Sequence, residues 1–251
     1  SNSATKYDVV TGVQGGAVNA SIIASYAKGS ESAAASRLKT FWDNAANTEL
    51  FKDWRGGLAQ GYAFEGGLYN SSPMEKFLES ELSDITKMNR NLNIGITNEL
   101  SGKINEFTQD NILYGSNLTN ALYASMSTAG FFAPVDAFGS DYYNGSAIWN
   151  LDIFSGVNKC LKRHAESDVV IDVILTSSSH LKKVDPSKNT TLHNAARYLQ
   201  VSNYYASMNA YLKAVDSFPN ATFRYLVAPL RHFPYIQKPL EMSQDEVDEI
   251  F

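Results

Sequence analysis

The sequence predicts an α/β fold with a largely parallel sheet, and three observations support this class. Short β-branched runs alternate along the chain with stretches whose apolar residues recur at helical spacing. Residues 169–176 form an apolar run, interrupted by Asp172, that is typical of a strand buried on both faces of a sheet. The 251 residues, 44% of them hydrophobic, suffice for one large core. We therefore predict a single domain over residues 1–251.

The first elements to be expected are a strand, a tight turn and two helices. Residues 7–10 are a short β-branched run, and the glycines that follow indicate a turn. From Ala17 to Gly29, small and apolar residues recur at helical spacing, which predicts a helix. A second helix is expected over residues 31–43. The Gly- and aromatic-rich residues 44–72 are interpreted as a connection.

The middle of the chain predicts two more helices and a pair of strands. Ser72 and Pro73 favour a helix start, because Ser caps helix N-termini and Pro fits the first helical position. Residues 93–100 and 103–107 look like strands around a Ser-Gly turn. A helix over residues 117–128 completes this part.

The last third predicts a long helix between two strands. The apolar run at 169–176 is the first strand, residues 190–214 form the helix, and residues 222–228 form the second strand. A final helix is expected from about Ser243.

Composition excludes several functional classes. The formal net charge is -5, which argues against a nucleic-acid partner because such proteins need a basic surface. No segment approaches the roughly 20 apolar residues that span a bilayer, so we expect no transmembrane segment. The single Cys160 excludes a disulfide framework and a multi-Cys zinc site. The four histidines lack metal-ligand spacing, so no metal or other cofactor is expected.

One segment has the pattern of an active-site turn. Gly12 and Gly16 lie two residues on either side of Gln14, between a predicted strand and a predicted helix. Such glycines permit a strained turn that pushes the central side chain out at the sheet edge, as in the nucleophile elbow. That chemistry needs a hydroxyl or thiol at the apex, and a carboxamide is not a nucleophile. Gly-rich strand-to-helix turns are also common in α/β proteins without marking a site.

This segment does not stand alone. Residues 7–20 resemble the nucleophile elbow of patatin-like phospholipases, in which Ser would occupy position 14. Further stretches resemble one secreted protist branch of that family in the same order along essentially the whole chain: residues 52–57, 67–73, 121–134, 149–155 and 223–226. The resemblance implies a three-layer patatin-like fold, with a mostly parallel central sheet flanked by helices.

The resemblance also implies a Ser–Asp dyad, and this sequence departs from it at both positions. The family's Asp-Gly-Gly or Asp-Gly-Ala motif corresponds here to Asn144, Gly145 and Ser146. An amide cannot take a proton from a nucleophile, so the general base is also missing. The degenerate positions are therefore Gln14 and Asn144, and the elbow and turn glycines are Gly12, Gly15, Gly16 and Gly145.

The family's N-terminal strand and Gly-rich oxyanion loop would precede the elbow, and this chain starts after them. We expect that residues are omitted or removed by processing, that a cleaved piece stays docked, or that a partner supplies the strand. The end at Phe251, within a predicted helix, indicates a trimmed C-terminus.

Three further groups of residues have alternative interpretations. Residues 159–164 carry a small basic cluster on a predicted helix, which we expect to be solvated, with contact to anionic lipid headgroups as the alternative. Ser140 and Asp141 could offer a displaced hydroxyl and carboxylate, although nothing holds them opposite an oxyanion site. Cys160 falls in an apolar stripe and is expected to pack rather than react.

Six Asn-x-Ser/Thr sequons favour a secreted or lumenal protein, with a cytoplasmic one as the alternative. They lie at Asn19, Asn70, Asn117, Asn144, Asn189 and Asn220. A glycan on Asn144 would occupy the mouth of the former active site.

The leading prediction is a catalytically inactive patatin-like protein that acts as a structural or binding component of a larger assembly, with protein partners. The alternatives are a patatin-like lipid acyl hydrolase and a lipid-binding protein that keeps the acyl pocket without cutting. A pocket plugged by Gln14 would favour the first, and an open apolar pocket would favour lipid binding. A serine or an acid beside Gln14 would favour the hydrolase.

Overall fold

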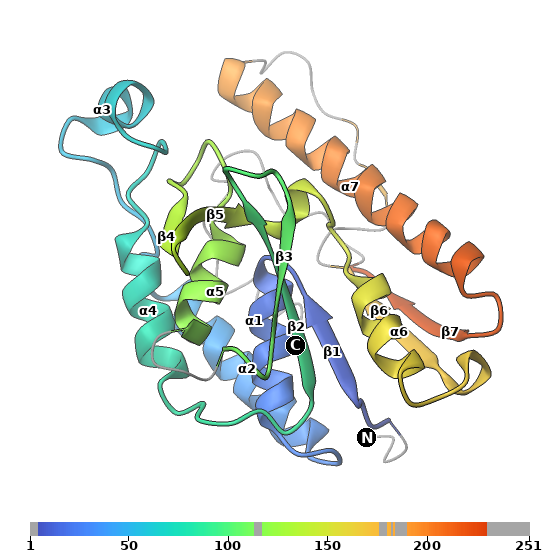
Figure 1. Ribbon diagram of the computed structural model, residues 1–251. Helices are drawn as coiled ribbons and strands as arrows, with labels where there is room; N and C mark the ends of the chain where they lie inside the picture. The colour runs from blue at the N-terminus through green and yellow to red at the C-terminus, as the bar shows by residue number, and fades with distance from the viewer. Residues whose placement is uncertain (1–4, 113–116, 176–179, 182, 184–189, 230–251) are drawn as a thin grey trace.

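The computed structural model describes residues 5–112, 117–175, 180, 181, 183 and 190–229. Its helices are α1 Gly15–Ser25, α2 Glu31–Ala46, α3 Gly57–Phe64, α4 Ser72–Leu82, α5 Asn117–Met126, α6 Ile153–Leu161 and α7 Thr191–Ser217 (Figure 1). Its strands are β1 Val9–Gly12, β2 Asn91–Asn98, β3 Ile104–Thr108, β4 Val135–Ala137, β5 Ser140–Asn144, β6 Val170–Ile174 and β7 Thr222–Val227.

The predicted α/β class is confirmed, with helices on both sides of a mixed sheet. The main sheet has the order β1-β2-β5-β4, with β3 also paired to β2. Parallel pairing joins β1 to β2, with Val10 opposite Leu92, and also joins β6 to β7 in a second, two-stranded sheet. The remaining pairs in the main sheet, β2 with β3, β2 with β5 and β4 with β5, are antiparallel. Among the strands that the structure describes, β1, which leads into the predicted elbow, therefore lies at the edge of the main sheet.

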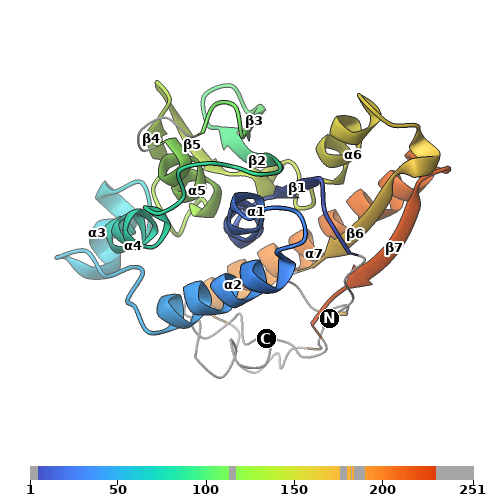
Figure 2. The ribbon, with the colours of Figure 1, turned by 90° about the horizontal axis from the view of Figure 1, so that it is seen from below.

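The larger core lies on one face of the main sheet. Alternate residues of β2, namely Leu92, Ile94 and Ile96, point into it and are completely buried. Helices α1, α2, α4 and α5 cover this face, and Figure 2 shows α1 and α2 on the side of β1 and β2 opposite to α6. The other alternate residues of β2 face α6, as expected from the two-residue period of a strand.

The α6 face is polar where it meets the main sheet and apolar where it meets β6 and β7. Asn93 Nδ2 donates to Asp152 Oδ2 at 2.7 Å, and Lys159 Nζ donates to the Leu92 carbonyl oxygen at 2.9 Å. Beyond this polar layer, Ile153 and Val157 of α6 join a second core. That core is completed by apolar residues of β6, α7 and β7, with Cys160 packed against it as expected.

Four expectations about local structure are corrected. The connection at 44–72 contains the short helix α3. Ser72 does not cap its helix: its own N–H is capped by Asn70 Oδ1 at 2.9 Å, because Asn70 precedes the first helical turn. Lys159 is half-buried rather than solvated, since its ammonium group donates to the Leu92 carbonyl oxygen of β2.

The fourth correction concerns β6, which was expected to be buried on both faces. Val170 is 52% exposed and Ile174 is 64% exposed, because within the described residues β6 pairs only with β7 and one face of this small sheet is uncovered. The helix expected from Ser243 lies outside the described residues. None of the described helices is long and apolar enough to cross a membrane.

Three side chains connect the end of the main sheet to the small sheet. The Tyr7 hydroxyl donates to Asp172 Oδ2 at 2.7 Å, and Arg224 Nε donates to Asp172 Oδ1 at 2.9 Å. The hydrogen bonds from Arg224 lower the pKa of Asp172, although burial of its carboxylate opposes them. Burial and the bond to Asp172 raise the pKa of Tyr7 to about 12.

We expect Asp172→Asn to lower the free energy of unfolding by about 1–2 kcal/mol at neutral pH, because Arg224 and Tyr7 lose a charged acceptor. The folded pKa of Asp172 lies below its unfolded value of about 3.9. The stabilisation is therefore complete above about pH 4 and is lost as the pH falls through the folded pKa. Denaturant titrations from neutral to strongly acidic pH should show the two proteins converging in stability.

The matched control is Asp141→Asn, which removes an exposed carboxylate from β5. The free energy of unfolding of Asp141→Asn at neutral pH should be close to that of wild type. A gap between wild type and Asp172→Asn that stays constant into strong acid would contradict the assignment.

Candidate functional site

The turn from β1 into α1, residues 12–16, has the geometry of a nucleophile elbow. Gln14 precedes the first residue of α1 with φ 54° and ψ -135°, a conformation that L side chains rarely adopt. Its backbone is fixed from two sides. The Gln14 N–H donates to Ser125 Oγ of α5 at 2.9 Å, and Ser125 Oγ donates to the Gly95 carbonyl oxygen of β2 at 3.1 Å. The elbow is thus tied to both neighbouring elements.

Close backbone approach explains two of the four glycines around this turn, Gly12 and Gly145. A Cβ on Gly12 would lie 2.1 Å from the Gly16 carbonyl oxygen, so the strand and the helix touch there. A Cβ on Gly145 would lie 2.4 Å from the Gly95 carbonyl oxygen. A Cβ on Gly15 would lie 3.3 Å from the Trp42 ring of α2, whereas a Cβ on Gly16 would meet no atom within 4 Å. Position 12 therefore requires glycine, and position 16 does not.

The side chain at the apex joins a chain of neutral hydrogen bonds. Gln14 Nε2 donates to Ser146 Oγ at 2.7 Å, and Ser146 Oγ donates to Asn144 Oδ1 at 2.8 Å. Asn144 Nδ2 then donates to Thr128 Oγ1 at 3.1 Å. The fold thus brings together two segments about 130 residues apart in the sequence, Gln14 and the turn after β5. None of the four side chains joined by these hydrogen bonds ionises at physiological pH.

Asn144 is held in place by its backbone as well as by its side chain. Its N–H donates to the Ser127 carbonyl oxygen at 2.9 Å, and its carbonyl oxygen accepts from Thr97 Oγ1 at 3.0 Å. The residue is 4% exposed. Because donors and acceptors on both sides are occupied, the orientation of its amide toward Ser146 is fixed by the fold.

A buried acid lies behind the elbow strand, on the α6 side. Asp152 caps α6, where its Oδ1 accepts from the Ser155 N–H at 3.2 Å. Its carbonyl oxygen accepts from Thr11 Oγ1 of β1 at 2.6 Å, and Asn93 donates to its other carboxylate oxygen. Burial raises the pKa of Asp152 despite these hydrogen bonds. Its contacts join α6 to β1 and β2, so its role is to position this helix.

A cavity of about 260 Å³ lies between β1, α6 and β6. Gly12, Val13 and Gly16 of the elbow form part of its wall, together with apolar residues of β6, but Gln14 does not line it. Small-molecule sites commonly measure roughly 300–1,000 Å³. This cavity is therefore small for a lipid acyl chain with its headgroup.

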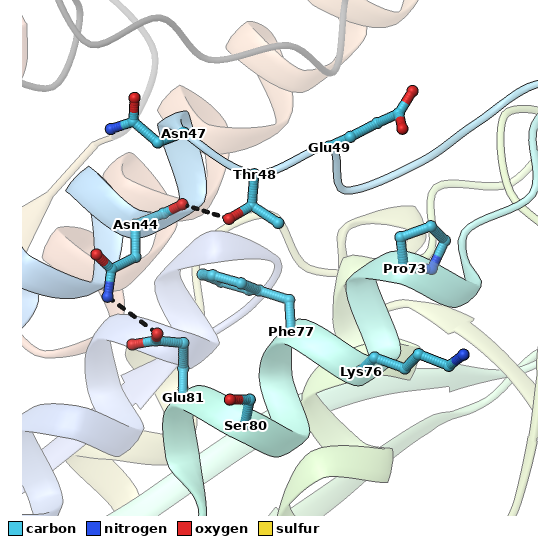
Figure 3. Close-up of a pocket in the computed structure, with 9 residues that line it drawn as sticks. All are labelled: Asn44, Asn47, Thr48, Glu49, Pro73, Lys76, Phe77, Ser80 and Glu81. Atoms are coloured by element: carbon cyan, nitrogen blue, oxygen red, sulfur yellow. Dashed lines mark hydrogen bonds between the residues drawn. The ribbon is translucent and has the colours of Figure 1, made fainter.

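A second depression, of about 510 Å³, lies between the end of α2 and α4, and no residue of the elbow lines it (Figure 3). Phe77 forms its apolar centre, and the rim is polar. Thr48 Oγ1 donates to the Asn44 carbonyl oxygen and Asn44 Nδ2 donates to Glu81 Oε1, so much of the rim is already hydrogen-bonded within the protein. Among the residues that line this depression, no hydrogen bond joins a hydroxyl to a carboxylate or an amine.

Comparison with known families assigns the chain to one of them. The model of the patatin-like phospholipase family matches residues 3–155, which include the elbow, the β5 turn and the start of α6. The chain belongs to the patatin-like phospholipase family. No curated protein gives a significant match to it.

Other positions where a patatin-like protein could carry chemistry do not meet the elbow. Ser140 Oγ accepts from Asn98 Nδ2 at 2.7 Å, and the Asp141 side chain is exposed at the β4–β5 hairpin. Within the described residues, no hydrogen bond joins Ser140 or Asp141 to Gln14, and the two do not form a displaced dyad. The same residues contain no group of three or more side chains placed to bind a metal ion.

Ser146 is the residue near the apex to which sequence reasoning assigned no role. Its hydroxyl lies directly between Gln14 and Asn144. The signal was present in the sequence, because Ser146 is the third residue of the turn that starts at Asn144. What the sequence did not show is that the turn places this hydroxyl against the apex side chain.

The sequons of this patatin-like chain differ in accessibility. Asn220 is exposed in the turn between α7 and β7. Asn70 and Asn117 are half-buried, and Asn19 accepts a hydrogen bond from Trp42 Nε1 within the α1–α2 packing. Asn144 is buried with its Nδ2 engaged, and Asn189 lies outside the described residues.

Gly12→Ala should lower the free energy of unfolding by about 3 kcal/mol, because the new Cβ would overlap the Gly16 carbonyl oxygen. Gly16→Ala is the matched control, since it adds the same methyl group in open space within a helix. It should be neutral or stabilise by up to about 1 kcal/mol. Denaturant titration measures both, and equal losses would show that the close approach is not what requires glycine.

Proposed function

We propose that this protein is a catalytically inactive member of its family that acts as a structural or binding component of a larger assembly. The observation that carries the proposal is the neutral hydrogen-bond chain at the apex, from Gln14 through Ser146 to Asn144. In the family's dyad a serine hydroxyl would donate to a carboxylate at these two positions. In this protein both positions carry a carboxamide, that of Gln14 at the first and that of Asn144 at the second.

The chemistry of these groups supports inactivity. Acyl transfer needs a nucleophile whose proton passes to a base as the bond to the carbonyl carbon forms. The Gln14 amide nitrogen has no free electron pair to attack with. The Asn144 oxygen accepts a hydrogen bond but does not take up a proton at physiological pH. Both steps of the reaction therefore lack the required group.

A hydrolase that acts through Ser146 is the alternative that the geometry raises. The Ser146 hydroxyl is the one nucleophile that contacts the apex side chain among the described residues. Its proton, however, is directed at the Asn144 amide oxygen rather than at a carboxylate or an imidazole. Without a base, the hydroxyl keeps the low reactivity of an ordinary serine.

The compartment and the branch of the family belong to the same proposal. We place the protein with the secreted protist-type members, in a secreted or lumenal compartment, on the motif order and the sequons. Asn220 is the most accessible described acceptor for a glycan. A cytoplasmic protein would leave all the sequons unmodified.

A second candidate function, lipid-surface binding without cleavage, is favoured by α3. This helix projects from the body of the molecule (Figure 1). Tyr62 and Phe64 are each 85% exposed on it, and Leu58 is also exposed. Exposed aromatic side chains on a projecting helix suit the interface between water and lipid. The small cavity beside the elbow argues that lipid would bind at the surface rather than inside the fold.

We expect the natively purified protein to show no mass increase after treatment with a fluorophosphonate probe, because no activated serine is present. Intact mass spectrometry measures this, and it reports glycans in the same spectrum. The double variant Gln14→Ser, Asn144→Asp is the positive comparison. It places a hydroxyl and a carboxylate where the hydrogen-bond chain now runs, and it should label at least tenfold faster than wild type, about 1.4 kcal/mol in barrier.

Ser146→Ala is the control that locates any reaction. A stoichiometric adduct on the wild-type protein that Ser146→Ala abolishes would overturn the inactive assignment in favour of the hydrolase. An adduct that survives Ser146→Ala would place the nucleophile elsewhere and would overturn it as well.

The lipid-surface function predicts that vesicles of neutral phospholipid retain the protein during sedimentation. The variant Tyr62→Ser, Phe64→Ser should weaken the partition at least about tenfold, because two interfacial aromatic anchors are lost. Tyr225→Ser, which removes a 54% exposed aromatic from β7, is the matched control and should keep binding. Equal binding by all three proteins, or by none, would remove this second candidate.

A further inference from the structure

The cavity between β1, α6 and β6 is bounded by the edges of two strands. Consecutive residues of both strands line it, residues 9–13 along β1 and residues 169–175 along β6. Side chains on one face of a strand belong to alternate residues, so an unbroken run means that the backbone edge of each strand forms part of the wall. We call the space between these two edges the slot.

Neither edge that faces the slot has a strand partner. Among the described strands, β1 pairs with β2 alone and β6 pairs with β7 alone. Side chains bridge the interval, since Tyr7 reaches Asp172 of β6 with its hydroxyl. The backbone N–H and C=O groups along both edges therefore have no ladder partner in the described part of the chain. Unpaired edges of this kind are templates for a further strand.

Helices close the two remaining sides of the slot. Ala20 and Ile23 of α1 line it from one side, and Gly156 and Val157 of α6 line it from the other. Figure 2 shows these two helices on opposite sides of β1. An occupant would thus have a strand edge on each flank and a helix on each face. This is the environment of a central strand in a layered α/β fold.

A glycine in the slot has no explanation within the chain itself. Gly16 lies in the first turn of α1 and lines the slot, yet a Cβ there would meet no atom within 4 Å. Glycine inside a helix costs about 1 kcal/mol relative to alanine. Close approach of a ligand to the backbone is a condition that requires glycine. A main chain lying in the slot beside Gly16 supplies that condition.

The remaining residues of the sequence do not suit a strand in the middle of a sheet. The two longer stretches outside the described residues lie within 176–189 and over 230–251, and the first is mostly polar. The second contains Pro234 and Pro239, which lack the N–H that a ladder requires, and it ends in a run rich in acids. The other stretches have only four residues each. The segment that fits the slot therefore comes from outside these 251 residues.

We propose that the slot binds an extended segment of a separate polypeptide, which becomes a strand between β1 and β6. Its N–H and C=O groups pair with the two facing edges, and its side chains point alternately at α1 and α6. Because the slot measures only about 260 Å³, these side chains are small, such as those of glycine, alanine and valine. The two sheets then become one. The inference rests on the proposed role as a binding component and names the chemistry of its partner.

The first test uses the full chain and a synthetic probe, acetyl-Gly-Val-Gly-Val-Gly-amide. Cys160 lines the slot and is the single cysteine, so its rate of alkylation by a maleimide reports whether the slot is filled. The peptide at about 5 mM should slow this reaction at least about threefold. A control peptide with N-methyl groups on both valines keeps the side chains but loses backbone donors, and it should not protect Cys160. No protection by the first peptide, or equal protection by both, would overturn the proposal.

The second test locates the bound peptide with Gly16→Leu, whose side chain would enter space beside the slot that is now open. This variant should raise the dissociation constant of the peptide at least about tenfold. Ala33→Leu adds a similar side chain to an exposed position of α2 that does not line the slot, and it should bind like wild type. Denaturant titration shows whether each variant is folded. Unchanged binding by folded Gly16→Leu would overturn the slot as the site, and the N-methyl comparison on wild type needs no variant.

The third test sets the source of the strand by mass spectrometry of the natively purified protein. A separate segment should add mass under native conditions that is lost in denaturant, and its release should speed alkylation of Cys160. A strand that stays covalently joined after denaturation would belong to a longer form of this chain and would overturn the separate source. A native protein without added mass, whose Cys160 already reacts at the full rate, would overturn it as well.

The outcomes for the slot and for the inactive elbow can be told apart. A fluorophosphonate adduct together with peptide protection of Cys160 would overturn the inactive assignment and leave the strand site standing. Absence of both the adduct and the protection would overturn the strand site alone.

Discussion

The contact between Gly12 and Gly16 is the constraint on which the arrangement of this protein depends. Because the strand and the helix touch backbone to backbone there, α1 leaves β1 at a sharp angle and packs directly over β1 and β2. Val18 and Ile22 of α1 are consequently completely buried against β2. The turn also forces Gln14 into a positive-φ conformation, which costs on the order of 1–3 kcal/mol for a residue other than glycine. Burial of α1 offsets that strain.

The geometry of the elbow and its chemistry depend on different residues. Gly12 and Gly145 hold the backbone through contacts that any larger residue would break, and Ser125 fixes the Gln14 N–H. None of these contacts involves the side chain at position 14. The apex can therefore change from a hydroxyl to a carboxamide without loss of the turn. A neutral hydrogen-bond network then takes the place that a reactive pair would hold.

Local patterns were sufficient where the determining interaction is local. Apart from the short helix α3, the order of strands and helices through residue 128 follows from periodicity and turn residues, as do the hairpin of β2 and β3 and the elbow glycines. The exposed face of β6 did not follow, because an apolar run shows that a strand is apolar and not which of its faces another element covers. The position of Ser146 against Gln14, and the bond from Lys159 to β2, depend on segments distant in sequence. Such contacts are set by tertiary packing and leave no local signal.

The polar layer under α6 has a consequence for how the molecule opens. Along this layer, directional hydrogen bonds of Asn93, Asp152 and Lys159 lie between the main core and the second core, and Leu199 of α7 packs against the main core. Apolar surfaces tolerate sliding, whereas these bonds are made in one alignment only. The polar layer thus fixes how the two parts align, while contributing little to the free energy that holds them together. Separation along this layer breaks mainly polar contacts, which favours opening of β6, β7 and α7 as a cooperative unit of their own.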